Sequence, residues 1–272
     1  MRRETPQKPK APRNERLQKI LATAGLGSRR ALEKRIAAGD VRLNGSVAKL
    51  GDTAGINDMI SMDRQRWKVA TSSPVHRCLV YNKPEGEITT RTDPQGRPTV
   101  FDHMPKLKST RWIAVGRLDI NTTGLLLMTT DGELAHALMH PSNRVDREYA
   151  VRVRGPVEPE VLERLKNGVE LDDGPASFSD IVSSGGSEGN LWFHVTILEG
   201  RNREVRRLWA SQGIRVSRLK RVRYGAVFLP KRLLMGKIHE LSPEDCLVLR
   251  EDVGLTASQS ELILIPQRSR KK

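Results

Sequence analysis

Apolar residues recur at helical spacing near the start of the chain, three or four positions apart, and therefore fall on one face of a short helix. Gly25 and Gly27 follow this helix, and glycine readily adopts the left-handed conformation in which helices end. Ser28 then suits the N-cap of a second helix, whose buried side is formed by Leu32 and Ile36. The apolar face of the first helix consists of Leu17, Ile20, Leu21 and Ala24.

The pattern changes to alternation after Gly39, which closes the second helix. Val41 and Leu43 flank a basic residue, and Asn44-Gly45 is a strong signal for a two-residue hairpin turn. Residues 58–67 predict a closing strand. Residues 70–74 are small, polar and end in proline, as is typical of a linker. Together these signals predict a small helix–helix–hairpin domain over residues 15–70, with a linker at 71–76.

The remaining chain mixes strand and helix signals without a regular βαβ alternation. Thr130-Asp-Gly-Glu133 predicts a capping box that opens a helix to about Met139, and residues 158–166 and 203–211 are further helix candidates. Residues 183–189 predict the tip of a long hairpin. Separate runs of strands and helices favour an α+β domain over 77–253 with a mainly antiparallel sheet. Its strands are expected at 78–81, 112–115, 125–129, 149–153, 192–198 and 246–249.

Positive charge is concentrated in the small N-terminal domain. Of the 272 residues, 47 are Lys or Arg and 32 are Asp or Glu, giving a net charge of +15. Residues 16–70 carry eleven basic and five acidic residues, a net +6, whereas residues 71–253 carry only +3. The ends, residues 1–14 and 254–272, are basic and are expected to bury too little apolar area to offset the entropy of ordering, so we expect a disordered arm and a flexible tail. This clustering favours nucleic acid as the partner.

Several classes of protein are disfavoured. The longest apolar runs are far shorter than the roughly 20 residues that a membrane-spanning helix needs, and no secretory signal opens the chain. Cys78 and Cys246, the only cysteines, lie in apolar runs and are expected as buried thiols in a reducing compartment, the cytoplasm. His136 and His140 lack a third metal ligand, and no nucleotide-binding glycine motif occurs.

Three segments of the larger domain could carry chemistry. Asp119 follows a strand and sits in a short loop between Gly116 and Gly124, a place where a rigid element can aim a carboxylate, although such a residue can also be a simple turn former. Tyr149 opens a strand and could either pack in the core or stack on a base. Residues 199–207 lead into a helix and begin a stretch with nine basic residues up to Arg223, a natural phosphate site.

Residues 15–70 resemble the S4 RNA-binding domain across their whole length. The similarity is carried by Arg16-Leu-Gln-Lys-Ile-Leu, by Gly27-Ser-Arg-Arg, and by residues 38–45, Ala-Gly-Asp-Val-Arg-Leu-Asn-Gly. It implies that the second helix and the hairpin hold structured RNA through its backbone. The RNA contacts expected in this domain are Arg16, Lys19, Ser28, Arg29, Arg30, Lys34 and Asn44.

Over about residues 16–250 the chain resembles the pseudouridine synthase family that carries an N-terminal S4 domain. The core of the similarity is Gly116-Arg-Leu-Asp-Ile-Asn-Thr-Thr-Gly-Leu-Leu-Leu, supported by Lys83-Pro-Glu-Gly, Arg147-Glu-Tyr and residues 199–209. Asn202-Arg-Glu and residues 93–101 are similar to the branch that modifies large-subunit ribosomal RNA.

This resemblance implies specific roles. Asp119 is the essential carboxylate, Tyr149 stacks on a flipped uracil, and Arg206 pairs with Asp119, a cation that would favour the ionised carboxylate. The reaction isomerises uridine to pseudouridine and needs no cofactor, metal or nucleotide. The partner is structured ribosomal RNA, with no membrane contact, and a monomer is the default expectation. Further RNA contacts are expected at Arg117, Arg201, Arg203 and Arg207.

Two other functions remain open at this point. A noncatalytic RNA-binding or ribosome-assembly factor would share the charge and the S4 domain but would not need Asp119. A pseudouridine synthase acting on small-subunit ribosomal RNA or transfer RNA would need Asp119 but a different substrate.

Overall fold

The computed structural model describes residues 14–72, 75–107, 110–187, 189–256 and 261–267. It divides into two compact units. The N-terminal unit comprises the described residues up to Val75, those of 106–111, and those from Thr256 onward; the central unit comprises residues 76–105 and the described part of 112–255. Both units contain helices and sheets, which confirms the predicted α+β class. The expected arm, residues 1–14, lies outside the described residues except for Asn14.

The N-terminal unit begins with the two helices that the apolar spacing predicts. They are α1 (Leu17–Thr23) and α2 (Arg29–Ala37), which bury their predicted apolar faces in a common core except for Ala24, the half-buried C-cap of α1. The Ser28 hydroxyl accepts a hydrogen bond from the Ala31 amide at 3.1 Å and so caps α2 as expected. Asn44 and Gly45 have positive φ angles in the turn between strands β2 (Arg42–Leu43) and β3 (Ser46–Val47), as a two-residue hairpin requires.

A five-stranded sheet in the order β18-β6-β5-β2-β3 completes this unit. The closing strand expected at 58–67 is in fact a hairpin of β5 (Met59–Met62) and β6 (Gln65–Ser72), with the turn at Asp63 and Arg64. The linker expected at 71–76 is wrong for residues 71–72, because they continue β6 and pair with residues 261–262. A short pair, β1 (Glu15–Arg16) and β4 (Thr53–Ala54), lies beside α1.

The flexible tail expected at 254–272 is wrong for residues 261–267. These residues form β18 (Glu261–Gln267), which pairs antiparallel with β6 over seven residue pairs, and Leu262 is buried in the N-terminal core. The physical reason lies in the run Leu262-Ile-Leu-Ile, which is apolar enough to join a sheet even though basic residues follow it. Residues 268–272 lie outside the described residues.

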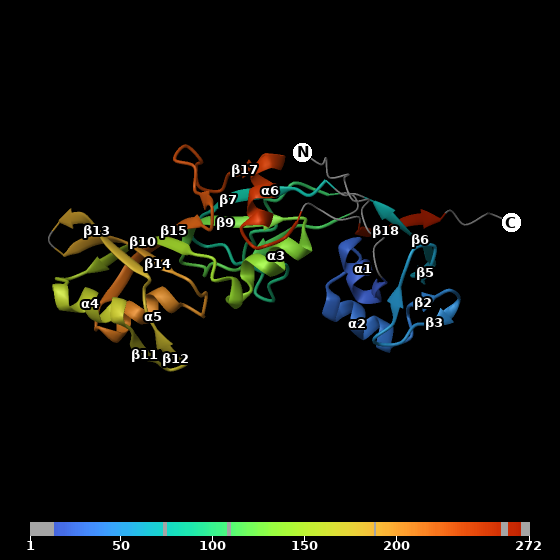
Figure 1. Cartoon of the computed structure of the whole chain (residues 1–272), viewed down its shortest axis with the longest axis horizontal. Helices are drawn as coiled ribbons and strands as arrows, with labels where there is room; N and C mark the ends of the chain where they lie inside the picture. Colours follow the sequence, from blue (N-terminus) through green and yellow to red (C-terminus); the bar gives the residue numbers. More distant parts are fainter. Residues whose placement is uncertain (1–13, 73–74, 108–109, 188, 257–260, 268–272) are drawn as a thin grey trace, which may run out of the picture. The chain divides into compact units, whose positions relative to one another are not determined.

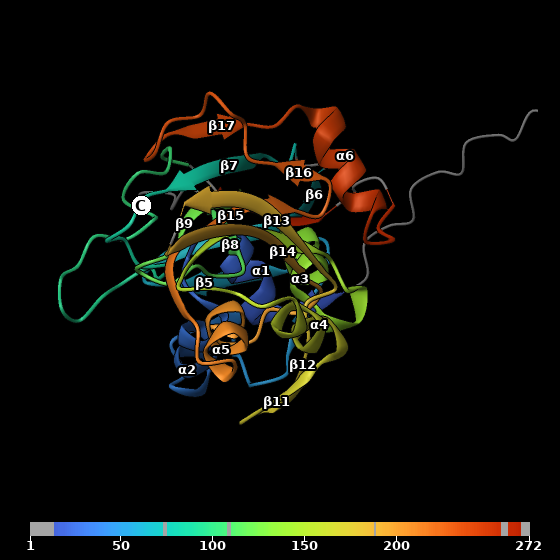
Figure 2. The ribbon, with the colours of Figure 1, turned by 90° about the vertical axis from the view of Figure 1, so that its left-hand side faces the viewer.

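The central unit is built on a nine-stranded sheet (Figures 1 and 2). Its main path is β13-β14-β10-β15-β9-β7-β17, with β16 paired to β15 and β8 paired to β9. Only β15 and β9 run parallel, so the sheet is mainly antiparallel, as predicted. The strands are β7 (Cys78–Lys83), β8 (Ile113–Val115), β9 (Thr123–Thr129), β10 (Arg147–Arg154), β13 (Asp180–Ser187), β14 (Asn190–Ile197), β15 (Arg215–Tyr224), β16 (Val227–Phe228) and β17 (Ile238–Glu240).

Four helices cover this sheet in two groups. One group is α3 (Gly132–Met139) and α6 (Pro243–Glu251), which share a core with β7 and β9. The other is α4 (Pro159–Asn167) and α5 (Glu204–Ser211), seen below β13 and β14 in both Figure 1 and Figure 2. In the second group Trp209 is fully buried, with its ring centroid 5.1 Å from that of Phe193. A small hairpin of β11 (Val169–Leu171) and β12 (Gly174–Ala176) follows α4, and a 3₁₀ turn (Pro141–Asn143) follows α3.

Two local predictions in this unit need correction. Residues 246–249, expected as a strand, lie inside α6, because Ser242 and Asp245 form a capping box and Pro243 occupies the first turn. The cap of α3 is Asp131 rather than Thr130, since the Asp131 carboxylate accepts the amides of Glu133 and Leu134, both at 2.9 Å. The remaining predicted strands and helices are confirmed to within a few residues. Both cysteines are buried and free, as expected.

Candidate active site

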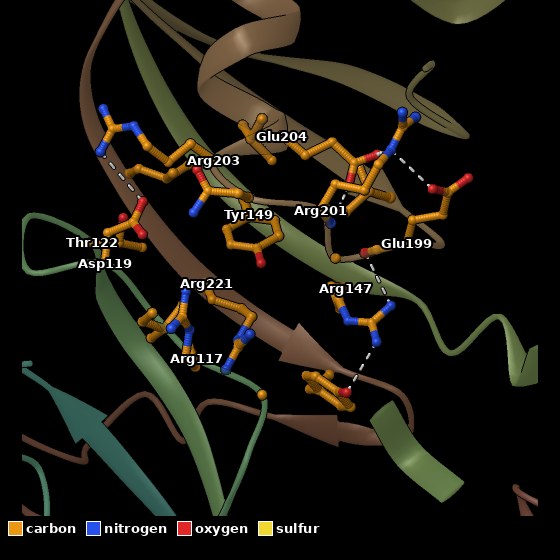
Figure 3. Close-up of a pocket in the computed structure, with 18 of the residues that line it drawn as sticks. Arg117, Asp119, Thr122, Arg147, Tyr149, Glu199, Arg201, Arg203, Glu204 and Arg221 are labelled. Carbon is orange, nitrogen blue, oxygen red and sulfur yellow. Dashed lines mark hydrogen bonds and ion pairs between the residues drawn. The ribbon is translucent and has the colours of Figure 1, made fainter. Parts of the chain in front are cut away.

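A cavity of about 380 Å³ opens in the central unit where three parts of the chain meet (Figure 3). These are the loop between β8 and β9, the start of β10 together with the end of β15, and the segment that leads into α5. The cavity therefore brings together all three of the segments singled out in the sequence, although they are up to about 90 positions apart. Arg117, Asp119, Tyr149, Arg201 and Arg203 all line it.

Asp119 is held by its own backbone. Gly116 turns the chain after β8 with a φ of +75°, and the Thr122 amide donates to the Asp119 carbonyl at 3.0 Å. The buried ammonium of Lys83, at the end of β7, donates to the Asp119 carbonyl at 3.1 Å and to the Thr122 carbonyl at 3.0 Å. The loop is thus fixed at both ends while the Asp119 carboxylate stays partly exposed. A rigid frame of this kind is what a reacting group needs.

Lys83 has no direct carboxylate contact within 4 Å among the residues the structure describes. Burial lowers its pKa to about 8, against which the more distant charges of Glu87 and Asp119 act. In the sequence Lys83 was noted only as part of a motif, and its hydrogen bonds to the Asp119 loop were not predicted. A lysine at the buried end of a strand, directly before Pro84, was the available signal.

The cation beside Asp119 is Arg203, not Arg206 as expected. The Arg203 guanidinium lies 3.5 Å from the Asp119 carboxylate, whereas Arg206 donates to the carbonyls of Asn121 at 2.9 Å and Val216 at 3.2 Å. Arg203 is the N-cap of α5 in a left-handed conformation, with φ +50°, which places its side chain on the Asp119 side. Burial, followed by the like charge of Arg203, lowers the pKa of Arg206.

Tyr149 lies on the cavity wall with 8% of its surface exposed. In the sheet it is opposite Val195 on β14 and Arg221 on β15, so its position is fixed by strands on both sides. Figure 3 shows its ring between the Asp119 loop and the segment that contains Glu199. An aromatic ring placed in this way could stack on a planar group that enters the cavity.

A network of opposite charges begins at the cavity, where Glu199, Arg201 and Glu204 line it, and includes two of the predicted RNA contacts, Arg201 and Arg207. Arg201 lies 3.0 Å from a Glu199 oxygen and 3.2 Å from an Asp173 oxygen, and Arg207 lies 2.7 Å from Asp173. Glu204 is buried and accepts the Arg201 amide at 3.0 Å, and its pKa is raised by burial. The charges of Arg201 and Arg207 are therefore paired within the protein, because both contact Asp173 in the β11–β12 turn. The spacing of these residues in the sequence did not reveal this contact.

Two buried arginines of the cavity were not predicted as site residues, although Arg147 was part of a motif that carried the family resemblance. Arg147 donates to the carbonyls of Val145, Leu198 and Glu199 at 2.8 to 3.0 Å and to the Tyr224 hydroxyl at 3.1 Å. Arg221 is 2% exposed, and its Nε donates to the Leu125 carbonyl at 2.7 Å. Arginines at buried positions of otherwise apolar strands were the signal that could have found them.

The predicted RNA contacts of the N-terminal unit fall into two groups. Several serve the fold: Ser28 caps α2, Asn44 bonds Asp58 at 2.9 Å, and Lys19 pairs with Glu15 at 2.7 Å. Arg16 donates to the Gly51 carbonyl. Three are exposed and have no ion-pair or hydrogen-bond partner among the residues described, which leaves their charge available to solvent or phosphate. They are Arg29, Arg30 and Lys34.

The family models match both units. Residues 77–211 match the model described as RNA pseudouridylate synthase, and residues 15–60 match the S4 domain. Two similar relatives are both named "Ribosomal large subunit pseudouridine synthase B". That of Escherichia coli O6:H1 is 54% identical over 261 residues, which cover 95% of this chain and 90% of the relative. That of Pseudomonas aeruginosa is 59% identical over 255 residues, which cover 93% and 66%.

This chain belongs to the RNA pseudouridylate synthase family and carries an S4 domain. A solved structure entitled "Crystal structure of pseudouridylate synthase" matches with a TM-score of 0.60 at 26% identity, covering 86% of this chain and 99% of that one. The chain spans 66% of the Pseudomonas relative and about half of the two Xanthomonas relatives. Among the described residues no helix is both long and apolar enough to cross a membrane.

Proposed function

We propose that this protein isomerises a uridine of large-subunit ribosomal RNA to pseudouridine. The observation that carries the proposal is the Asp119 carboxylate, which lines a cavity together with Tyr149 while Lys83 holds the Asp119 backbone carbonyl. The relatives from Pseudomonas aeruginosa and Escherichia coli O6:H1 carry a large-subunit pseudouridine synthase name, which supports the choice of RNA. We place this reaction in the cytoplasm and propose that the protein acts as a monomer.

The reaction rearranges one nucleotide. The N1–C1′ bond of uridine breaks, the base rotates, C5 bonds to C1′, and the proton that leaves C5 is balanced by a proton gained at N1. Asp119 acts at the sugar, where a carboxylate can stabilise or capture positive charge at C1′. Nothing is oxidised and no group is added, so the protein needs only to bind, orient and hold charge.

Reaching C1′ requires the target base to leave its stack. Base extrusion costs on the order of a few kcal/mol. Stacking on an aromatic side chain such as Tyr149 returns about 1–3 kcal/mol per base. Phosphate contacts supply the rest, with Arg29, Arg30 and Lys34 on α2 as the exposed cations of the N-terminal unit. We therefore assign docking to the S4 domain and chemistry to the central unit.

The test is release of tritium from RNA that contains 5-³H-uridine, because tritium leaves C5 when the new bond forms. Large-subunit ribosomal RNA, small-subunit ribosomal RNA and transfer RNA are compared at equal concentration. We expect release from large-subunit RNA alone. Release from only one of the other RNAs would overturn the substrate assignment. No release from any of them, with RNA binding intact, would support a noncatalytic RNA-binding factor instead.

A further inference from the structure

Two buried polar atoms of the cavity have neither a hydrogen-bond partner nor an ion-pair partner among the described residues. They are Nη2 of Arg221 and the hydroxyl of Thr122. Both side chains line the cavity, and each residue is only 2% exposed. An unpaired buried donor is costly, by about 1–3 kcal/mol and more for a charged group, so native proteins rarely retain one without a use. These atoms are therefore candidates for ligand contacts.

Arg221 is also a cation without a counter-charge. No carboxylate lies within 4 Å of its guanidinium among the described residues, whereas Arg201, Arg203 and Arg207 in the same region all contact one. Its other contacts are the Leu125 carbonyl and the face of Tyr224, whose ring centroid lies 5.1 Å away. These contacts fix its orientation and leave Nη2 unsatisfied.

The burial of Arg221 indicates which part of a nucleotide it would contact. A nucleotide in RNA enters a cavity base first, because its phosphates remain joined to the chain outside. The exposed cations at this cavity, Arg117 and Arg203, suit phosphate at its mouth. Arg221 lies opposite Tyr149 in the β10–β15 register, and directly opposed residues of an antiparallel pair project from the same face. A base that stacks on Tyr149 would bring an edge toward Arg221.

We infer that Arg221 recognises the target base by donating a hydrogen bond from Nη2 to one carbonyl oxygen of the uracil. This inference rests on the proposed function, since it takes uridine as the substrate. Uracil presents two carbonyl acceptors, O2 and O4, and a guanidinium is a donor only, so the pairing is chemically complementary. The Thr122 hydroxyl, which can both donate and accept, is a second unpaired group that could contact the base.

The test combines a change in the RNA with a change in the protein. The target uridine is replaced by 4-thiouridine or by 2-thiouridine, because sulfur accepts hydrogen bonds poorly. Each RNA is assayed with the wild type and with Arg221→Met. We expect one of the two thio substitutions to lower wild-type kcat/KM by about 10- to 100-fold, the range for a hydrogen bond to a charged group. In Arg221→Met the same substitution should have almost no further effect.

Arg218 supplies the matched control. It lies on the same strand, is exposed, and has no ion-pair or hydrogen-bond partner among the described residues. Arg218→Met should leave the penalty of the thio substitution as large as in the wild type. Arg221→Gln, which keeps an N–H donor without the charge, should recover part of the loss if Arg221→Met folds poorly, and melting curves of all three variants identify a folding defect.

Two results would overturn the inference. The first is an equal effect of each thio substitution in the wild type and in Arg221→Met, or no effect in the wild type. The second is a weaker salt dependence of RNA binding in Arg221→Met, which would assign a phosphate to this arginine. The same comparison can be made without turnover, by measuring the affinity of Asp119→Asn, with and without Arg221→Met, for each RNA. This measurement distinguishes a failure of the base contact from a failure of the proposed reaction.

Discussion

Lys83 connects a buried charge to the position of Asp119, the residue that we propose as the reacting carboxylate. Its ammonium donates to the carbonyls of Pro84, Asp119 and Thr122, all at 3.0 to 3.1 Å, so it holds both ends of the Asp119 loop. Removing the side chain would free this loop as well as leave three carbonyls unpaired. A substitution of Lys83 therefore tests the rigidity of the Asp119 loop without changing the Asp119 side chain.

Lys83→Met should change how stability depends on pH. The pKa of Lys83 is about 8 in the folded protein and 10.5 for an ordinary lysine. Between these values the unfolded chain binds more protons than the folded one, so the contribution of Lys83 to the free energy of unfolding rises with pH. The wild type should therefore gain about 2–3 kcal/mol relative to the variant across this window. Urea unfolding at a series of pH values measures the difference; a constant difference would contradict the burial of a charged amine.

Gly124 and Gly116 provide a second test at this scale. Both have positive φ angles, but a Cβ on Gly124 would lie 2.2 Å from the Arg221 carbonyl oxygen, whereas one on Gly116 would have nothing within 4 Å. Gly116→Ala should cost about 1–2 kcal/mol of stability from backbone strain alone. Gly124→Ala should cost more, about 2–5 kcal/mol, because the parallel contact between β9 and β15 must also open. Equal losses of unfolding free energy in the two variants, measured with urea, would show that Gly124 does not lie close to the Arg221 carbonyl.

The sequence predicted Asp119 and Tyr149 as members of one site, and the structure places both in one cavity. It predicted Arg206 as the arginine beside Asp119, whereas the structure places Arg203 there. Arg206 follows Arg203 by three positions. Which of the two lies beside Asp119 depends on the left-handed backbone of Arg203 at the start of α5. A single non-glycine residue at positive φ leaves little trace in composition or periodicity.

At the scale of elements, β18 links the end of the chain to the N-terminal sheet. Leu262 is 2% exposed in that core, while Ile265 on the same strand is 44% exposed. Leu262→Ala should lower the stability of the N-terminal unit by about 2–5 kcal/mol. Ile265→Ala, its matched control, should cost about 1 kcal/mol or less. Amide hydrogen exchange in α1 and β6 reports the effect, and unchanged protection in Leu262→Ala would contradict this pairing.

Two of the elements that the sequence failed to predict show what local patterns omit. Residues 246–249 look like a strand because they are apolar in sequence, yet the capping box at Ser242 commits the segment to a helix. β18 was missed because its partner, β6, lies about 190 positions earlier, and a pairing so distant has no local signature. By contrast α1, α2 and the Asn44-Gly45 hairpin were predictable, since their spacing, caps and turn agree with one another.

At the scale of the whole molecule, the excess of positive charge and the proposed catalytic cavity occupy different parts of the chain. Residues 16–70 carry a net +6, and α2 exposes Arg29, Arg30 and Lys34. Around the cavity, in contrast, Arg201, Arg203 and Arg207 are opposed by nearby carboxylates. The expected consequence is that binding and catalysis respond to different substitutions.

Arg29→Ala combined with Arg30→Ala should weaken RNA binding and flatten its dependence on salt, because each lost phosphate contact lowers the slope by about 0.7–0.9. Single-turnover isomerisation at saturating protein should stay within about two-fold of the wild type, since neither residue lines the cavity. Affinity and salt slope are measured together by filter binding. Unchanged affinity in this double variant would exclude α2 as the docking surface.

The central claim is that the Asp119 carboxylate carries the reaction. Its most direct test is single-turnover tritium release from 5-³H-uridine-labelled large-subunit ribosomal RNA, with wild type and Asp119→Asn at protein concentrations that saturate binding. The account predicts release by the wild type, a fall of at least about a thousand-fold in the variant, and similar RNA affinity for both. Release by Asp119→Asn at a rate near that of the wild type would contradict it.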